Sequence, residues 1–209
     1  SFSFVTLTNR VGEEWGQLVG AERNRDENGN LILTDDGLWT VTKGKSLGSV
    51  LPDFTGGIFS SLRWKDLTLN TTFTYQKGGK FFSLTENWGT YSGLTINTVG
   101  NNDKGNPIRD AVEDGGGVHV TGVTANGTAI DTYQDAVTHF NQQYSNRIAD
   151  PFIHDASYFK LSELSLNYNV PLNNDVIKGL QLGLIAKNVW LISTSDDNYH
   201  NWDPSQFST

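Results

Sequence analysis

Apolar and polar positions alternate most clearly along residues 158–191. A period of two places successive side chains on opposite faces of an extended chain, so residues 158–170 (YFKLSELSLNYNV) are predicted to form an amphipathic β-strand. Pro171 is expected to end this strand, because proline cannot donate the next hydrogen bond of the ladder. One face is predicted to carry Lys160, Ser162, Leu164, Leu166, Tyr168 and Val170, and the other Phe159, Leu161, Glu163, Ser165, Asn167 and Asn169. Residues 180–190 show the same alternation of apolar and polar positions. The segment ends in Trp190, and one of its faces is formed by Leu180, Leu182, Leu184 and Ala186.

A second pair of alternating segments covers residues 58–76, with a tight two-residue turn predicted at Lys65-Asp66. The first segment places Ile58, Ser60, Leu62 and Trp64 on one face. The next opposes Leu67, Leu69, Thr71, Phe73 and Tyr75 to a row of hydroxyl and amide side chains, Thr68, Asn70, Thr72, Thr74 and Gln76. A solvent-facing row usually includes charges, so this one favours the water-filled lumen of a barrel. A plain solvated sheet face remains the alternative.

The intervening regions carry turn residues and little periodicity. Asn28-Gly29 predicts a turn. Residues 85–157 are rich in Gly, Asn and Asp and are interpreted as a long loop, with a local helix over residues 131–144. There the apolar side chains Tyr133, Val137, Phe140 and Tyr144 recur at helical spacing. A loop of this length counts against a simple sandwich, whereas large outer-membrane barrels carry such loops outside the cell.

Composition restricts the class of protein. A chain of 209 residues without an initial Met fits one large all-β domain or a piece of a longer protein. The absence of Cys excludes disulfides and thiol chemistry, and a net charge of −8 disfavours nucleic acid as a partner. The apolar runs are too short for a transmembrane helix, but a β-barrel remains open because its strands alternate.

Tests for catalytic and cofactor motifs predict no enzyme and no cofactor. Gly44-Lys45-Ser46 lacks the first glycine of a phosphate-binding loop, where Trp39 stands. The His residues show no zinc-binding spacing, and nothing places Asp196-Asp197 opposite another acidic pair. A weak calcium-loop pattern is formed by Asn24, Asp26, Asn28 and Asp35, although Asn and Asp replace the Asp and Glu of its two end positions. A β-turn explains the same residues.

Five aromatic residues in the predicted loops are candidates for contact with a ligand or a partner protein. Their rings offer flat apolar surfaces that stack on sugars or peptides, and they serve equally well to pin loops to one another. These residues are Trp39, Trp88, Tyr91, Tyr199 and Trp202.

Three segments carry a family resemblance. LPDFTGGIFSSLRWKDLTLNTTFTYQKGGKFFS (51–83), IHDASYFKLSELSLNYNVP (153–171) and IAKNVWLIS (185–193) resemble, in this order, late-barrel segments of SusC/RagA-family TonB-linked outer-membrane proteins of Bacteroidetes. Asp203-Pro204 is similar to the aspartyl-proline that follows in that family. The chain departs from the family pattern at Trp64 and Asp66, where Tyr and Gly are usual, and at Ser162, where Arg often precedes Glu.

The resemblance implies that residues 1–209 are the C-terminal portion of a barrel domain, with the plug, the TonB box and the last strand outside this chain. The fold expected is an all-β, antiparallel transmembrane β-barrel segment with long extracellular loops at residues 21–55, 85–157 and 193–209. The function implied is TonB-dependent import of oligosaccharides or peptides across the bacterial outer membrane, together with a SusD-like surface lipoprotein. TonB would act through the absent plug.

Side-chain directions follow from this expectation. The lumen side is predicted to carry Thr68, Asn70, Thr72, Thr74, Gln76, Glu163, Ser165, Asn167 and Asn169. Leu164, Leu166, Leu182 and Leu184 are expected to face lipid, with Trp64, Tyr168 and Trp190 near the aromatic girdles. A soluble β-sandwich that binds carbohydrate is the alternative from another class of protein.

Overall fold

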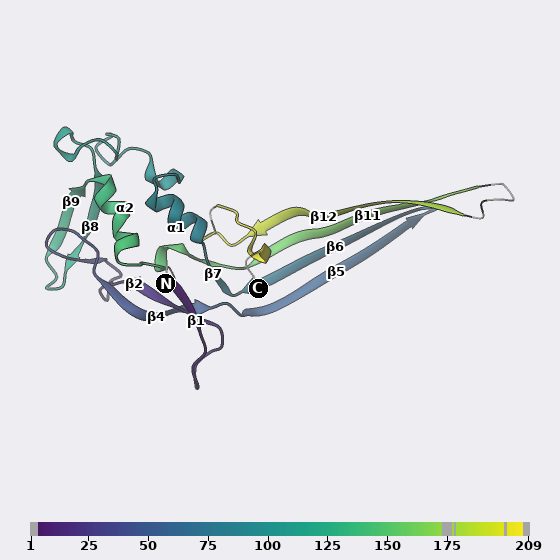
Figure 1. Ribbon diagram of the computed structural model, residues 1–209, viewed down its shortest axis with the longest axis horizontal. Coiled ribbons are helices and arrows are strands. Elements are labelled where there is room, and N and C mark those ends of the chain that lie inside the picture. Colours follow the sequence, from purple (N-terminus) through teal and green to yellow (C-terminus); the bar gives the residue numbers. More distant parts are fainter. Residues whose placement is uncertain (1–3, 173–176, 178, 199, 207–209) are drawn as a thin grey trace. The chain divides into compact units, whose positions relative to one another are not determined.

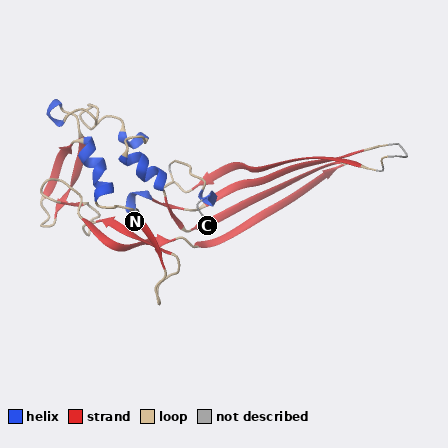
Figure 2. Ribbon diagram, viewed as in Figure 1, coloured by secondary structure: helices blue, strands red, loops and turns tan. Residues whose placement is uncertain are grey.

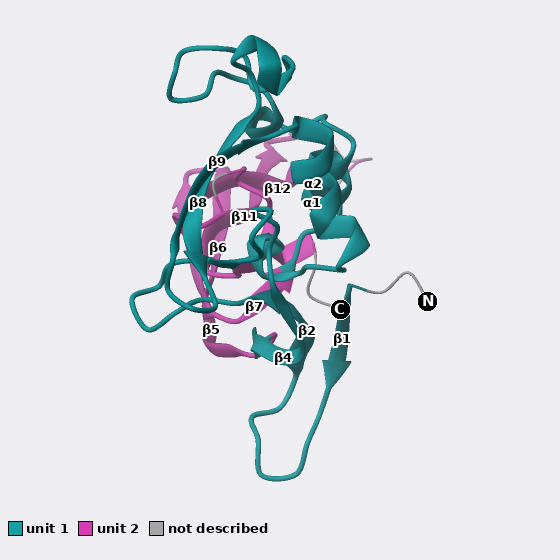
Figure 3. Cartoon of the chain, turned by 90° about the vertical axis from the view of Figure 1, so that its left-hand side faces the viewer, with its two compact units in different colours: residues 1–49, 82–153 teal, residues 50–81, 154–209 magenta. Residues whose placement is uncertain are grey.

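A computed structural model describes residues 4–172, 177, 179–198 and 200–206 of the chain. The fold is mainly β, with short helices (Figures 1 and 2). The chain divides into two compact units (Figure 3). Unit 1 contains residues 1–49 and 82–153, and unit 2 contains residues 50–81 and 154–209. None of the helices in the described part of the chain has the length and apolar character needed to cross a membrane.

Unit 2 is built on a four-stranded antiparallel sheet with the strand order β12-β11-β6-β5. Its strands are β5 (Pro52–Trp64), β6 (Leu67–Gly78), β11 (Tyr158–Val170) and β12 (Leu180–Thr194). β5 and β6 are joined by the predicted two-residue turn, in which Lys65 has a φ of 52°. β11 ends at Val170, directly before Pro171, as predicted. The sheet is open, and β5 and β12 form its two edges.

Unit 1 combines two small sheets with two helices. An antiparallel sheet contains β1 (Val5–Thr8), β2 (Gln17–Arg23) and β4 (Val41–Ser49). The other sheet pairs β8 (Val118–Thr124) with β9 (Ala129–Gln134), and β3 (Ile32–Leu33) lies parallel to β8. The helices are α1 (Leu84–Tyr91) and α2 (Ala136–Ser145), with 3-10 turns at Ile96–Thr98, Val112–Asp114 and Asp150–Phe152. Two short strands that pair with each other, β7 (Lys80–Phe82) and β10 (Ile153–Asp155), lie where the chain passes from one unit to the other, and the 3-10 turn Pro204–Gln206 belongs to unit 2.

The interpretation of residues 85–157 as a long loop was wrong, because this region contributes most of a packed unit. Its core includes Val120, Ile148 and Phe152, which are almost completely buried together with Leu33. The backbone that leads into β3 lies close to Gly122 of β8, where a Cβ atom would lie 2.5 Å from the carbonyl oxygen of Leu31. Glycine is therefore needed for β3 to pair with β8.

The helix predicted over residues 131–144 begins only at Ala136. Residues 131–134 belong to β9, where Asp131 pairs with Thr121 of β8 in antiparallel register. Asp135 then caps α2, because its carboxylate accepts hydrogen bonds from the backbone N–H groups of Val137 and Thr138 at 2.9 and 3.1 Å. The prediction was wrong over 131–135, since the spacing of apolar residues does not reveal a strand partner.

The uninterrupted alternation predicted for β11 was also wrong at its beginning. The register with β6 shifts between Leu161 and Glu163, so one extra residue is inserted opposite β6. Such a bulge reverses the faces of all residues on one side of it. Phe159 therefore shares a face with Phe73, and their rings stack with centroids 5.6 Å apart, whereas Lys160 pairs with Thr74 on the opposite, polar face.

Candidate functional site

The nine residues predicted to line a lumen share one face of the unit 2 sheet. Cross-strand partners in an antiparallel ladder project to the same side. Asn70 pairs with Ser165, and Thr72 pairs with Glu163. The same register brings together Thr68 with Asn167, Thr74 with Lys160, Gln76 with Tyr158, and Asn169 with Gln181 of β12. The structure therefore joins the two predicted polar rows into one surface, which we call the polar face.

Hydrogen bonds run across the polar face from strand to strand. The Ser61 hydroxyl of β5 donates to the Asn70 side-chain oxygen at 2.7 Å, and the Asn70 amide nitrogen donates to the Ser165 hydroxyl at 3.1 Å. Nearer the bulge, the hydroxyls of Thr74 and Ser162 are hydrogen-bonded to each other. These bonds fix the direction of side chains that presented only a polar pattern in the sequence.

The opposite side of the same sheet is apolar, and we call it the apolar face. One row across all four strands consists of leucines, because Leu62 pairs with Leu69, Leu69 with Leu166, and Leu166 with Leu184. The next row contains Trp64, Leu67, Tyr168 and Leu182. Many of these side chains are open to solvent: Leu62 is 65% exposed and Leu184 is 75% exposed. A contiguous exposed apolar surface of this kind indicates contact with another apolar phase or partner.

The separation of the two faces has exceptions at the strands that form the edges. Phe59 of β5 pairs with Thr72, and Ile185 of β12 pairs with Ser165, so both lie on the polar face and are exposed. The sequence pattern had not singled out either residue.

A buried ion pair lies at the end of the sheet in unit 2. The Lys160 ammonium contacts the Asp203 carboxylate at 2.6 Å and donates to the Ser205 hydroxyl at 2.9 Å. The Lys160 side chain is only 5% exposed, against 23% for Asp203. Burial alone would raise the pKa of the Asp203 carboxyl, but hydrogen bonds from Lys160 and Ser205 and the Lys160 charge outweigh it and hold the pKa below its usual value.

This ion pair fastens the segment that contains the predicted aromatic Trp202. The Trp202 backbone N–H donates to the Asn198 side-chain oxygen at 3.0 Å, and the Asn198 amide nitrogen donates to the Trp202 carbonyl at 2.7 Å. We call residues 195–198 and 200–206, with their attachment to Lys160, the C-terminal latch. Tyr199, another of the predicted aromatics, lies outside the described residues.

Trp39 is held within unit 1 by a chain of buried glutamines. Its backbone N–H donates to the Gln142 side-chain oxygen at 2.7 Å, and the Gln142 amide nitrogen donates to Gln134 at 3.2 Å. The Trp39 ring packs edge-on against His139, and the Arg23 guanidinium lies over it at 5.2 Å. These contacts fit the alternative that this aromatic pins segments together.

His139 of α2 lies beside this cluster. Its Nδ1 lies 3.1 Å from the Gln134 side-chain oxygen, which also accepts a bond from Gln142. Burial, and to a smaller degree the positive charge of Arg23, lowers the pKa of His139 to about 4. The ring is therefore neutral at neutral pH.

Trp88 and Tyr91 also have partners inside unit 1. Both belong to α1, and the rings of both lie against Tyr144 of α2, with centroids 5.6 and 4.8 Å away. The aromatic contacts thus join the two helices, whereas the sequence had left open a role in binding.

The residues of the calcium-loop pattern do not converge on one point, since Asp26 and Asn24 have different partners. The Asp26 carboxylate accepts hydrogen bonds from the backbone N–H groups of Asn28 and Asn30 and from the Asn30 side chain. Asn24 bonds instead to Thr40 and Thr42. This is the geometry of a hairpin turn. Among the residues that the structure describes, no three His, Cys, Asp or Glu side chains are grouped as metal ligands.

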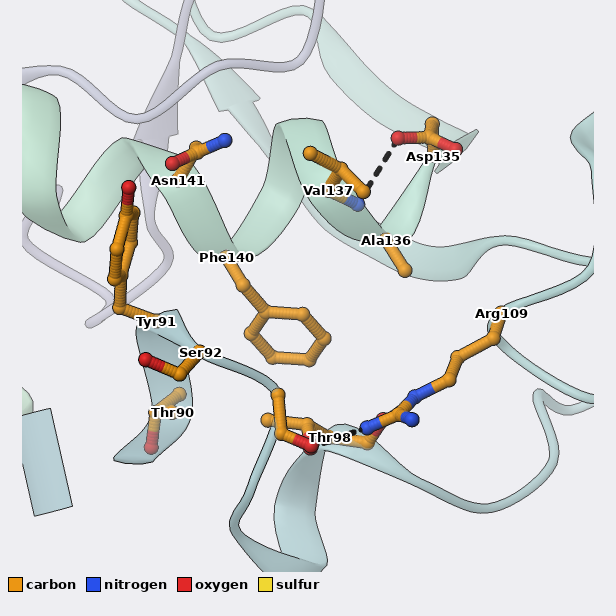
Figure 4. A pocket seen from close by; sticks show the side chains of 11 residues that line it. Thr90, Tyr91, Ser92, Thr98, Arg109, Asp135, Ala136, Val137, Phe140 and Asn141 are labelled. Carbon is orange, nitrogen blue, oxygen red and sulfur yellow. Dashed lines mark hydrogen bonds between the residues drawn. The ribbon is translucent and has the colours of Figure 1, made fainter. Parts of the chain in front are cut away.

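Unit 1 contains a pocket of about 290 Å³ that the sequence did not indicate (Figure 4). It is bounded by the end of α1, the first turns of α2 and the 3-10 turn Ile96–Thr98. Phe140 of α2 lies at its centre and Arg109 on one side. Arg109 comes from an irregular, polar part of the chain, where no pattern distinguishes it from a solvated residue.

Comparison with known proteins gives a weak structural link. No family model matches the chain, and no curated protein matches it. A structure of the RagAB peptide transporter is similar over 90% of this chain and 20% of the other, with 20% identity and a TM-score of 0.45. The RagAB peptide importer in its closed-closed and open-open states gives 18% identity in each case, with TM-scores of 0.46 and 0.48. The chain spans about a fifth of the length of these proteins.

Proposed function

We propose that this chain forms part of the wall of an outer-membrane, TonB-dependent importer of oligosaccharides or peptides. The observation that supports this most directly is the division of one sheet into an exposed apolar face and a face that is polar across its two central strands, β6 and β11. Strands of transmembrane barrels alternate in this way, since one side meets lipid and the other meets the aqueous interior.

The lengths of the strands suit a bilayer. The four strands of unit 2 contain 12 to 15 residues, and a tilted strand needs about 9–11 residues to cross the hydrocarbon layer. A soluble sandwich would bury its apolar face against a second sheet. Exposures of 65% for Leu62 and 75% for Leu184 therefore favour the wall of a barrel over a carbohydrate-binding sandwich.

The open edges of the sheet point to neighbouring strands. β5 and β12 are long and rich in apolar residues, and within the part of the chain that the structure describes each is paired on one side only. Unpaired strand edges are unfavourable in lipid, where no water satisfies the backbone groups. The proposal therefore places further strands beside both edges, in the rest of the intact protein.

The orientation and the partners in this proposal come from the family resemblance. The Lys65-Asp66 turn and Pro171 would lie on the periplasmic side, and residues 85–157 would lie outside the cell, facing a SusD-like lipoprotein. Energy would come from TonB through a plug, and the chain itself would contribute no catalytic group and no cofactor. The polar face, including Asn70, Thr72 and Ser165, would line the path of the ligand.

The two faces can be tested by placing the same charge on each. Leu184→Arg should block assembly in the outer membrane, because arginine on the lipid side near mid-bilayer costs about 2–4 kcal/mol. Thr72→Arg should assemble, since it places the charge on the polar face next to Glu163, its partner in the register. The measurement is the amount of folded intact protein in outer-membrane fractions, with Leu184→Phe as a size control. Equal assembly of both arginine variants would refute the proposal.

A further inference from the structure

The pocket of unit 1 combines one fixed cation with an apolar wall. Arg109 is held by three hydrogen bonds: Nε donates to the Thr98 carbonyl at 2.8 Å, and Nη2 donates to the Gly93 carbonyl at 2.5 Å and the Thr98 hydroxyl at 2.9 Å. These bonds use the Nε–Nη2 edge of the guanidinium. Among the described residues, neither an acceptor for Nη1 nor a carboxylate partner for Arg109 is found.

A guanidinium that is already fixed binds an anion at a reduced entropic cost. Asp135, the acidic residue among those that line the pocket, directs its carboxylate to the first N–H groups of α2, as the dashed line to Val137 shows (Figure 4). Its charge is thus used to cap the helix.

The apolar wall lies beside this cation. The Phe140 ring projects into the middle of the pocket, and the side chains of Tyr91 and Val137 lie on either side of it (Figure 4). Val137 is 67% exposed although it is apolar. The volume of about 290 Å³ is at the lower end of the range for ligand pockets, which fits a group the size of one amino-acid residue.

We propose that this pocket binds a carboxylate joined to an aromatic or branched apolar group. The carboxylate accepts from Nη1 of Arg109, and the apolar group packs against Phe140. A free aromatic acid and the C-terminal residue of a peptide share this chemistry. The inference is independent of the proposed transport function, because it uses residues of unit 1 alone and none of the polar face.

A matched pair of probes tests the role of the charge. N-acetyl-L-phenylalanine and N-acetyl-L-phenylalaninamide differ only in the carboxylate, and their binding to the intact protein that contains this chain can be measured by ligand-observed NMR. The acid should bind about tenfold more tightly than the amide at low salt, as expected for one charge-assisted hydrogen bond at a partly exposed site. This preference should decrease as salt is added. Equal binding of the two probes, or no binding of the acid at millimolar concentration, would overturn the proposal.

Three variants locate the binding. Phe140→Ala should weaken the binding of both probes, and Arg109→Gln should remove the preference for the acid. Arg10→Gln changes an exposed arginine of the same unit and should leave both the binding and the preference as they are. Because Arg109 also fastens the 93–98 segment, circular dichroism must show that its variant is folded. If it is not, Phe140→Ala still decides the matter, since unchanged binding of the acid in that variant would exclude this pocket.

A second set of probes distinguishes the two possible sources of the ligand. Ala-Ala-Phe with a free carboxylate, the same tripeptide as its amide, and 3-phenylpropionate are compared on the unmodified chain. Tighter binding of the free tripeptide than of 3-phenylpropionate supports a peptide end, and the reverse order supports a small aromatic acid. Tighter binding of the tripeptide amide than of its acid would contradict both.

Discussion

The C-terminal latch yields a prediction in which two substitutions at one ion pair have unequal effects. Lys160 is almost completely buried, whereas Asp203 retains contact with water. Asp203→Asn therefore leaves an ammonium group buried without its counter-charge, and Lys160→Met leaves a carboxylate that is solvated and still hydrogen-bonded to Ser205. The loss of stability on removing one partner depends on how well the remaining charge is solvated and hydrogen-bonded.

The magnitudes follow from the burial of each group. Removing one partner of a buried pair costs about 3–5 kcal/mol, and the partial exposure of Asp203 places Asp203→Asn at about 3 kcal/mol. Lys160→Met should cost about 1 kcal/mol, because methionine occupies a similar volume and removes the desolvated charge. A difference of about 2 kcal/mol between the two variants corresponds to a roughly 30-fold difference in the population in which the C-terminal latch is detached from the sheet.

The assay is native-state hydrogen exchange of the intact protein that contains this chain, followed by mass spectrometry on peptides covering residues 195–206. Exchange in this segment should be faster in Asp203→Asn than in Lys160→Met, while peptides from α2 in unit 1 serve as the internal control. Faster exchange in Lys160→Met would refute the reasoning, since it would mean that attraction within the pair outweighs the desolvation of the lysine.

Acid should open the same latch. The pKa of Asp203 is lower in the folded chain than in the unfolded chain, so its contribution is fully present above the unfolded value of about 4. The contribution is lost as the pH falls from there through the lower, folded value. Exchange of residues 195–206 should therefore accelerate below about pH 4 in the unmodified chain, and Asp203→Asn should lack this acceleration.

Three further predictions concern other parts of the chain. The free energy of unfolding of unit 1 should decrease by up to about 3 kcal/mol as the pH falls from about 6.5 to 4, because the pKa of His139 is about 4 in the folded chain and near 6.5 in the unfolded chain. His139→Gln should reduce this dependence on pH, measured by hydrogen exchange of α2. Asp150→Asn should destabilise unit 1 by about 2 kcal/mol in the same measurement, since Asp150 accepts from Arg23 at 2.8 Å in a partly buried pair, and exchange unchanged from the parent would contradict this. Deletion of Ser162 should reduce assembly in the outer membrane strongly, because removing the bulge turns Lys160 toward the apolar face, whereas Ser162→Ala should assemble normally.

The parts of the fold that the sequence predicted are those in which the signal is local. The alternation over residues 67–76 gave β6 and its two faces, and the Lys65-Asp66 dipeptide gave the hairpin turn. Pro171 marked the end of β11 correctly. In each case the deciding information lies within a few residues, since a strand pattern, a turn and a proline all act on their own segment of backbone.

Unit 1 could not be predicted in this way, because much of its interior is polar. Gln142 and Gln143 of α2 and Gln134 of β9 are buried and hydrogen-bonded, so the spacing of apolar residues does not mark the inner face of α2. The pocket depends on Arg109 meeting the 93–98 segment, a contact between residues that no sequence pattern pairs. Long-range partners decided both features, whereas hydropathy patterns report only the local period.

The bulge at Ser162 accounts for two features of the first residues of β11. Their faces were predicted wrongly, and they include Lys160, to which the C-terminal latch is attached. With unbroken alternation, Lys160 would share a face with Leu164 and Leu166, among the apolar residues of β6 and β12. One inserted residue turns Phe159 and Leu161 to that face and Lys160 to the other, where it reaches Asp203. The apolar face thereby stays continuous to the end of the strand, with Phe159 stacked on Phe73. A lysine in an otherwise amphipathic strand is thus consistent with the proposed membrane wall, because the bulge gives its charge a partner away from the apolar face.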